Sequence, residues 1–244
     1  MGTFLYYACA VYCTILPALN TIAYQQANPT HNNKASITYF LNYAASNPTY
    51  IVQYKSSDMV LHIDSDVSYL SEPRSSSRTG VYYYLRSLTS DPTKNPKISP
   101  PENGPIHTEC RILRHVVDSS SKAELGGLFH NGKTAVPLRI TLNEIGFPQP
   151  PTPIKTDNSA AEGVVNATIR QKKFQGNGYA ILLYEVQDLK KMFLYWKPGY
   201  QNMGYYFTNI NHHITINKFG QPIYIWQTPS SNPTIRLCKD GKMP

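Results

Sequence analysis

The fold is best predicted from the run Met59-Val60-Leu61-His62-Ile63-Asp64-Ser65-Asp66, which continues into Val67-Ser68-Tyr69-Leu70. Apolar side chains alternate in it with His62, Asp64 and Asp66, which is the period of a β-strand. A carboxylate inside a core strand is costly to desolvate unless it is paired or binds a metal ion. The alternative is that the strand ends near Ile63 and that both aspartates lie in the turn after it, where aspartate is common. This run alone favours the turn, whereas the rest of the chain favours the strand.

The chain is long enough for one large domain, and its charge is unevenly distributed. It has 244 residues, of which 41% are hydrophobic, and this predicts a folded chain with a sizeable core. The formal net charge is +8, yet residues 1–57 contain only Lys34 and Lys55 as charged side chains. A basic balance of this size is compatible with a polyanionic partner, but it does not identify one.

The N-terminal residues and the cysteines argue against several classes of protein. Residues 4–24 are uncharged and mostly apolar, but the basic segment that begins a signal peptide is absent. Thr14, Pro17 and Asn20 would fit poorly in a membrane span, so we expect a buried helix of a soluble protein, with a membrane segment as the less favoured alternative. The four cysteines match neither a disulfide framework nor a zinc pattern, which favours reduced thiols inside the cell.

Helices and strands are expected in an order typical of a layered α/β fold. A helix over 3–26, broken or bent at Pro17, and a helix over 35–45 come first. Strands are predicted at 50–54, 59–66, 79–86 and 105–117, and a long helix follows from the serines at 119–121 towards Gly146. The remaining elements are a strand at 154–157, a short helix to Val165, a strand at 192–196 and a short helix over 202–207.

This order places three carboxylates where they can meet. Asp66 lies in the strand of the opening run, Glu124 in the first turn of the long helix and Asp157 at the end of a later strand. Carboxylates that converge in this way repel one another unless divalent cations lie between them, and such oxygen ligands suit magnesium. Spacing alone is weak support, because fifteen acidic residues offer many triples.

Six short motifs follow one another along the chain. They are Leu5-Tyr6-Tyr7-Ala8, Asp64-Ser65-Asp66-Val67-Ser68-Tyr69-Leu70-Ser71, Ala123-Glu124-Leu125-Gly126, Pro150-Pro151-Thr152-Pro153-Ile154, Thr156-Asp157-Asn158-Ser159 and Tyr195-Trp196-Lys197-Pro198-Gly199. In this order, and over most of residues 3–213, the sequence resembles the ribonuclease H region of copia-type retrotransposon polyproteins, together with the end of the preceding reverse-transcriptase region. The combination is specific, although each motif alone is weak.

The resemblance implies an α/β fold of the ribonuclease H type, with a mixed five-stranded sheet flanked by helices and preceded by a small helical segment. Residues 1–56 would then be the helical end of the reverse-transcriptase region, 57–212 the ribonuclease H-like domain and 213–244 a C-terminal tail. The implied activity is hydrolysis of the RNA strand of RNA–DNA hybrids with two Mg²⁺ or Mn²⁺ ions. The implied location is intracellular, in the cytoplasm, a virus-like particle or the nucleus. The expected partners are the hybrid and the reverse-transcriptase portion of the parent polyprotein, without a membrane.

The resemblance also assigns roles to individual residues. Asp66, Glu124 and Asp157 match the family's catalytic, metal-binding carboxylates, and Asp64 is a neighbour and not a ligand. Contacts to nucleic acid are expected from Arg170, Lys172, Lys173 and Asn202. For the basic residues of this group, an ordinary solvated basic face is an equally favoured alternative.

One departure from the family bears on activity. The family's last carboxylate lies in a segment like Asn-Leu-Ala-Asp-Tyr-Phe-Thr-Lys, whereas residues 202–209 read Asn-Met-Gly-Tyr-Tyr-Phe-Thr-Asn. Tyr205 therefore stands where the fourth acid is expected, and a phenol is neutral near pH 7. The alternative function is a catalytically inactive retroelement remnant with at most weak nucleic-acid binding. A third and weaker alternative is a piece that works only when it is joined to its polymerase.

Overall fold

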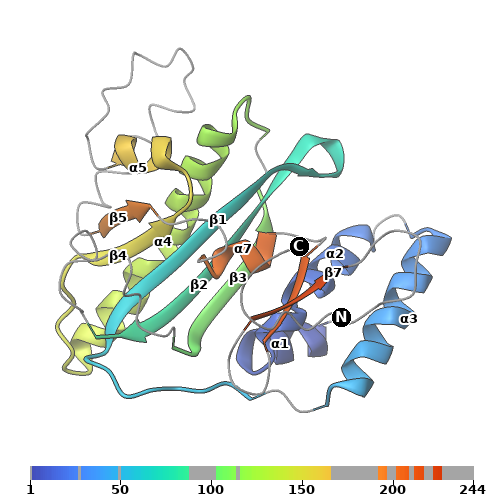
Figure 1. Ribbon diagram of the computed structural model, residues 1–244, viewed down its shortest axis with the longest axis horizontal. Helices are drawn as coiled ribbons and strands as arrows, with labels where there is room; N and C mark the ends of the chain where they lie inside the picture. Colours follow the sequence, from blue (N-terminus) through green and yellow to red (C-terminus); the bar gives the residue numbers. More distant parts are fainter. Residues whose placement is uncertain are drawn as a thin grey trace.

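The centre of the fold is a mixed β-sheet in the strand order β3-β2-β1-β4-β5 (Figure 1). The computed structural model describes residues 2–26, 29–48, 51–87, 103–113, 116–165, 192–196, 202–208, 212–216 and 222–226. The strands are β1 (Val60–Glu72), β2 (Ser76–Arg86), β3 (Pro105–Ile112), β4 (Thr152–Thr156) and β5 (Met192–Trp196). β1, β2 and β3 form an antiparallel meander, and β4 and β5 continue the sheet in parallel. The predicted α/β class with a mixed sheet is therefore confirmed.

The opening run of the sequence lies entirely within β1. The strand continues past Ile63 through Asp64 and Asp66, so the alternative of a turn after Ile63 is wrong. Antiparallel pairing with β2 places Asp66 opposite Gly80. Pairing with β4 covers only Ile63 and Asp64, so Asp66 lies beyond the paired part of β4. The side chain of Asp66 therefore lies beside the open end of a shorter neighbouring strand.

Helix α4 (Ser120–Glu144) covers one face of the sheet. It begins where predicted, because the side chain of Ser119 caps it by accepting a hydrogen bond from the backbone N–H of Lys122 at 3.3 Å. Every second residue of β1 faces this helix, and the shared core comprises Leu61, Ile63, Val81, Tyr83, Leu85, Leu125, Leu128, Ala135, Leu142, Ile154 and Ala161. Gly127 allows the close approach, since a Cβ there would lie 2.3 Å from a methyl group of Val67.

The opposite face of the sheet is covered by elements from both ends of the chain. These are α1 (Gly2–Ala10), the 3₁₀ turn η1 (Cys13–Ile15), α2 (Leu16–Gln25) and the short helix α7 (Gly204–Thr208), and α3 (His31–Ser46) packs beside α2 (Figure 1). Their core joins Ile15, Leu16, Leu19, Phe40, Tyr82, Tyr84, Cys110, Tyr206 and Phe207. The N-terminal helices thus share one hydrophobic core with the sheet.

A buried arginine also ties these N-terminal helices to the sheet. Arg78 of β2 is fully buried and forms an ion pair with Glu72 at 2.6 Å. Its guanidinium also donates to side chains of α2, to Asn20 and Thr21 at 3.1 Å each. Because a buried guanidinium is costly without partners, these contacts link α2 to the strands by more than apolar packing.

Several details differ from the predictions. The helix expected over 3–26 is interrupted at Val11 and Tyr12, and Pro17 lies in the first turn of α2, where its missing N–H costs no helical hydrogen bond. Residues 51–54 form no strand. Two short strands, β6 (His212–Ile216) and β7 (Pro222–Trp226), pair antiparallel in the region expected to be a tail. Among the described residues, no helix has the length and apolar character needed to cross a membrane.

Candidate metal centre

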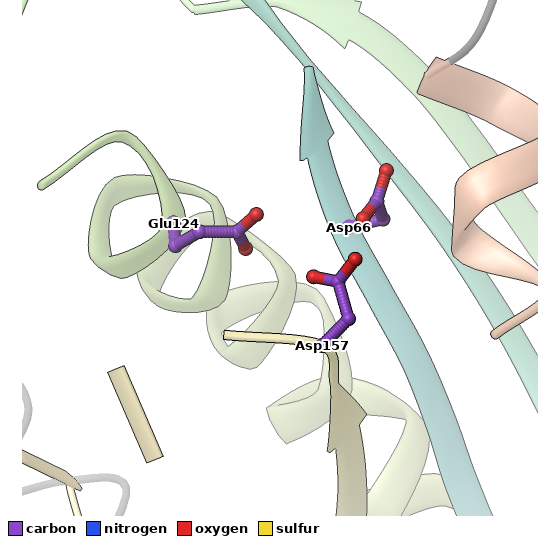
Figure 2. A group of neighbouring side chains, drawn as sticks. All are labelled: Asp66, Glu124 and Asp157. Atoms are coloured by element: carbon purple, nitrogen blue, oxygen red, sulfur yellow. The ribbon is translucent and has the colours of Figure 1, made fainter. Parts of the chain in front are cut away.

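Three carboxylates from three different elements meet beside the open end of β4 (Figure 2). Asp66 comes from β1, Glu124 from just beyond the first turn of α4, and Asp157 directly follows β4. One oxygen from each of the three lies within 4.8 Å of the others. The structure therefore brings together the three residues that the sequence singled out.

The local structure of each element explains this convergence. The Ser119 cap fixes the start of α4, which positions Glu124 over the sheet. After β4 ends, Asn158 accepts a hydrogen bond from the backbone N–H of Ala161 at 2.9 Å and caps α5 (Ser159–Val165). Asp157 is held between these two elements at the end of a strand. Its carboxylate points towards Asp66 (Figure 2).

Burial raises the pKa of all three carboxylates, and repulsion from neighbouring carboxylates adds to this effect at Asp66 and Glu124. Asp66 is 4% exposed, and desolvation together with the nearby Asp157 raises its pKa to about 7. The pKa of Glu124 is raised well above its ordinary value by burial first, and then by Asp66 and Asp157. Burial also raises the pKa of the partly buried Asp157. Without a cation the cluster holds protons, which is the behaviour of crowded carboxylates.

The donor set of this cluster fits a hard divalent cation. All its members offer carboxylate oxygens, which magnesium and manganese prefer. The Oε2 atom of Glu124 is buried and has no hydrogen-bond partner among the residues that the structure describes. Such an oxygen is costly to bury unless a cation or a proton satisfies it. Asp66, Glu124 and Asp157 are therefore the residues that would hold the ion.

Asp64 has a different environment, although it lies only two residues before Asp66. It is fully buried, and its carboxylate forms an ion pair with Lys155 of β4 at 2.6 Å. It also accepts hydrogen bonds from the backbone N–H of Met203 at 3.0 Å and from the hydroxyl of Tyr84 at 3.3 Å. These contacts agree with the prediction that Asp64 is a neighbour and not a ligand.

Helix α7 reaches the cluster through Thr208, which the sequence did not single out. Thr208 is 1% exposed, and its hydroxyl donates a hydrogen bond to the carboxylate of Asp66. This hydrogen bond lowers the pKa of Asp66 and partly offsets the effect of burial. Tyr205, the position at which the sequence resemblance led us to expect a fourth acid, belongs to the same helix.

The residues predicted to contact nucleic acid fall into two groups. Arg170, Lys172 and Lys173 lie outside the described residues. Asn202 lies in the interior, 4% exposed, where its amide donates to the carbonyl of Ser65 at 2.8 Å and accepts from the backbone N–H of Gly204 at 2.9 Å. Its side chain thus holds the start of α7 against β1, and its contact with nucleic acid stays a prediction.

Comparisons with known proteins give low similarity throughout. No protein-family model matches the chain, and no curated protein matches it. The ribonuclease H domain of a Mycobacterium tuberculosis protein, solved as a maltose-binding protein fusion, is 13% identical, covers 59% of this chain and 86% of that chain, and has a TM-score of 0.38. LC11 ribonuclease H1 in complex with an RNA/DNA hybrid is 10% identical over 59% of this chain and 88% of that one, with a TM-score of 0.41. A foamy viral protease-reverse transcriptase in complex with double-stranded DNA is 18% identical over 63% and 92%, with a TM-score of 0.35. Scores this low do not identify the family.

Proposed function

We propose that this chain is a ribonuclease H-like domain that cleaves the RNA strand of RNA–DNA hybrids with divalent cations. The observation that carries the proposal is the cluster of Asp66, Glu124 and Asp157, whose oxygens lie within 4.8 Å of one another on three separate elements. The sheet around it, an antiparallel meander extended by two parallel strands, supports the same proposal. The order of the six sequence motifs supports an origin in a copia-type polyprotein.

The chain's own residues would act by holding and orienting charge. Asp66, Glu124 and Asp157 provide oxygen ligands, and the burial of the first two keeps competing water away from one side of the centre. Bound Mg²⁺ or Mn²⁺ supplies an activated water and stabilises negative charge on the leaving oxygen. The net charge of +8 favours association with a polyanion in a salt-dependent way. The same proposal includes the reverse-transcriptase portion of a longer chain as a partner and an intracellular location for the protein.

A second candidate is an inactive remnant that keeps the fold. Tyr205 favours it, because three carboxylates carry less negative charge for two cations than four would. In this case the chain binds nucleic acid weakly, if at all, and does not cut it. Position 205 therefore separates the two candidates.

Cleavage of a labelled RNA–DNA hybrid by the purified full chain tests the proposal. The assay is run with Mg²⁺ and with Mn²⁺ on the native chain, on Asp66→Asn and on Tyr205→Asp, with double-stranded DNA as the control substrate. Cleavage of the RNA strand that disappears in Asp66→Asn supports the nuclease. Activity only in Tyr205→Asp indicates a scaffold inactivated at one position. If none of the three folded proteins cleaves the hybrid, the nuclease proposal is contradicted and the inactive remnant is supported.

A further inference from the structure

The carboxylate of Asp66 also accepts a hydrogen bond from the hydroxyl of Thr208. Thr208 lies in α7, is 1% exposed, and places its Oγ1 within hydrogen-bonding distance of two acceptors. One is the Oδ2 atom of Asp66, and the other is the backbone carbonyl of Tyr205 at 3.1 Å.

The hydroxyl has a single proton, so its two acceptors compete for it. A charged carboxylate is the stronger acceptor, because hydrogen bonds to ionised groups are about twice as strong as those between neutral groups. The proton of Thr208 is therefore directed to Asp66 whenever Asp66 is ionised. This hydrogen bond from α7 holds the Oδ2 atom of Asp66, whose carboxylate lies beside that of Asp157 (Figure 2).

Thr208 can hold this position because α7 is fixed against β1. Gly204 contacts the strand so closely that a Cβ there would lie 2.9 Å from both the carbonyl of Asp64 and the N–H of Asp66. The amide of Asn202 and the backbone N–H of Met203 add hydrogen bonds to β1 at 2.8 and 3.0 Å. At the other end of the helix, a Cβ on Gly80 would lie 2.6 Å from the Cβ of Phe207. The short helix therefore has little freedom to carry Thr208 away from Asp66.

We propose that Thr208 is a positioning residue of the metal centre, whose hydroxyl holds the Asp66 carboxylate in the orientation that binds a divalent cation. This inference rests on the proposed function and deepens it. A neutral donor stands here beside Asp66, so the carboxylate is oriented without a further negative charge. Partners of this kind typically change metal affinity by about 10–100-fold when they are removed.

The test is Mn²⁺ binding by the full chain, measured by isothermal titration calorimetry without substrate. Thr208→Val removes the hydroxyl at nearly constant volume and is expected to weaken Mn²⁺ binding by about tenfold. Thr208→Ser keeps the hydroxyl and is expected to bind within about twofold of the native chain. The matched control is Thr134→Val, which removes a hydroxyl that donates to Glu109 at 3.0 Å, away from the centre, and is expected to leave the affinity unchanged.

Two comparisons keep the proposal open to refutation. Native-like Mn²⁺ affinity in folded Thr208→Val overturns it, and Thr208 is then only a packing residue. If Thr208→Val does not fold, the pair Thr208→Ala and Thr208→Ser gives the same test, since equal affinities overturn the proposal and a tenfold gap supports it. If the native chain binds no Mn²⁺, or if its Mn²⁺ binding persists in Asp66→Asn, the proposed function fails as well. Native binding with no effect at position 208 refutes the positioning role alone.

Discussion

Asp64 and Asp66 lie two residues apart on one strand, and both carboxylates are buried. The regions around them differ in how the negative charge of the buried carboxylate is balanced. Asp64 is neutralised within the chain by Lys155 and by donors from Tyr84 and Met203. Asp66 instead faces two further carboxylates, and its pKa is raised to about 7. The first arrangement stabilises the fold, while the second leaves negative charge that a cation can use.

The difference teaches that sequence position on a strand does not distinguish a structural acid from a ligand. Both aspartates alternate with apolar residues, and both side chains point to the α7 face. What separates them is the length of β4, which reaches Asp64 and places Lys155 beside it, and then ends before Asp66. Variants that remove the charge of either aspartate, or that change residues near them, test this account.

The largest effect is expected at Asp64. Asp64→Asn removes the charge opposite the buried Lys155 and is expected to lower the free energy of unfolding by about 3–5 kcal/mol. Urea unfolding followed by circular dichroism measures it. The double variant Asp64→Asn/Lys155→Met removes both charges and should regain a large part of the loss. A single variant as stable as the native chain would contradict the structural role of this ion pair.

The next effect is a pH dependence at His62, in the same half of the strand. Burial, together with Arg86 and Lys155, lowers the pKa of His62 to about 3, and its ring stacks on Tyr84 at 5.5 Å. In the unfolded chain the histidine takes up a proton near pH 6.5, so the folded state loses stability as the pH falls below that value and towards 3. Between pH 7 and pH 4 the native chain should lose about 2–3 kcal/mol more than His62→Phe. Equal losses in both proteins would show that His62 titrates normally.

Replacing Asp66 by asparagine should change the free energy of unfolding in the opposite direction to the same replacement at Asp64. Without divalent cations at pH 8, Asp66→Asn removes repulsion among buried carboxylates and is expected to stabilise the fold by about 2 kcal/mol. Because the folded pKa is raised, the destabilisation by ionised Asp66 grows as the pH rises from 4 through 7, so the gain should shrink at pH 5. Thermal unfolding of both proteins at the two pH values measures it. Destabilisation by Asp66→Asn at pH 8 would mean that the centre is not strained.

A smaller effect is expected where α7 joins the two regions. Gly204→Ala forces a Cβ to within 2.9 Å of two backbone atoms of β1 and should destabilise the fold by about 1–2 kcal/mol. Gly126→Ala is the matched control, since a Cβ there meets nothing within 4 Å and should stabilise α4 by about 0.5–1 kcal/mol. Urea midpoints that shift in the same direction for both variants would contradict the close docking of α7.

Local patterns in the sequence were sufficient for much of the fold and for the three carboxylates. The alternation in the opening run predicted a strand, although that run alone favoured an end near Ile63, and the serines before α4 predicted the start of that helix. Asp66, Glu124 and Asp157 were assigned through the resemblance of the short motifs around them, because their spacing alone was weak support. These features depend on residues close in sequence, where period and capping rules apply.

Partners that are distant in sequence were not predictable in the same way. Lys155 meets Asp64 across 91 positions and Thr208 meets Asp66 across 142, and both contacts depend on strand register and helix docking. The link between α2 and the sheet includes buried Arg78, which looks like an ordinary surface residue in the sequence. The burial of Asn202 was not predictable for the same reason, because a polar residue gives no local sign that its amide is buried.

A crystal structure of the full chain grown with Mn²⁺ tests the central claim most directly. An anomalous difference map then locates the metal independently of activity. The account predicts a peak bounded by carboxylate oxygens of Asp66, Glu124 and Asp157, with Asp64 still paired to Lys155. A well-ordered cluster without a peak, or a peak at Asp64 instead, would contradict it.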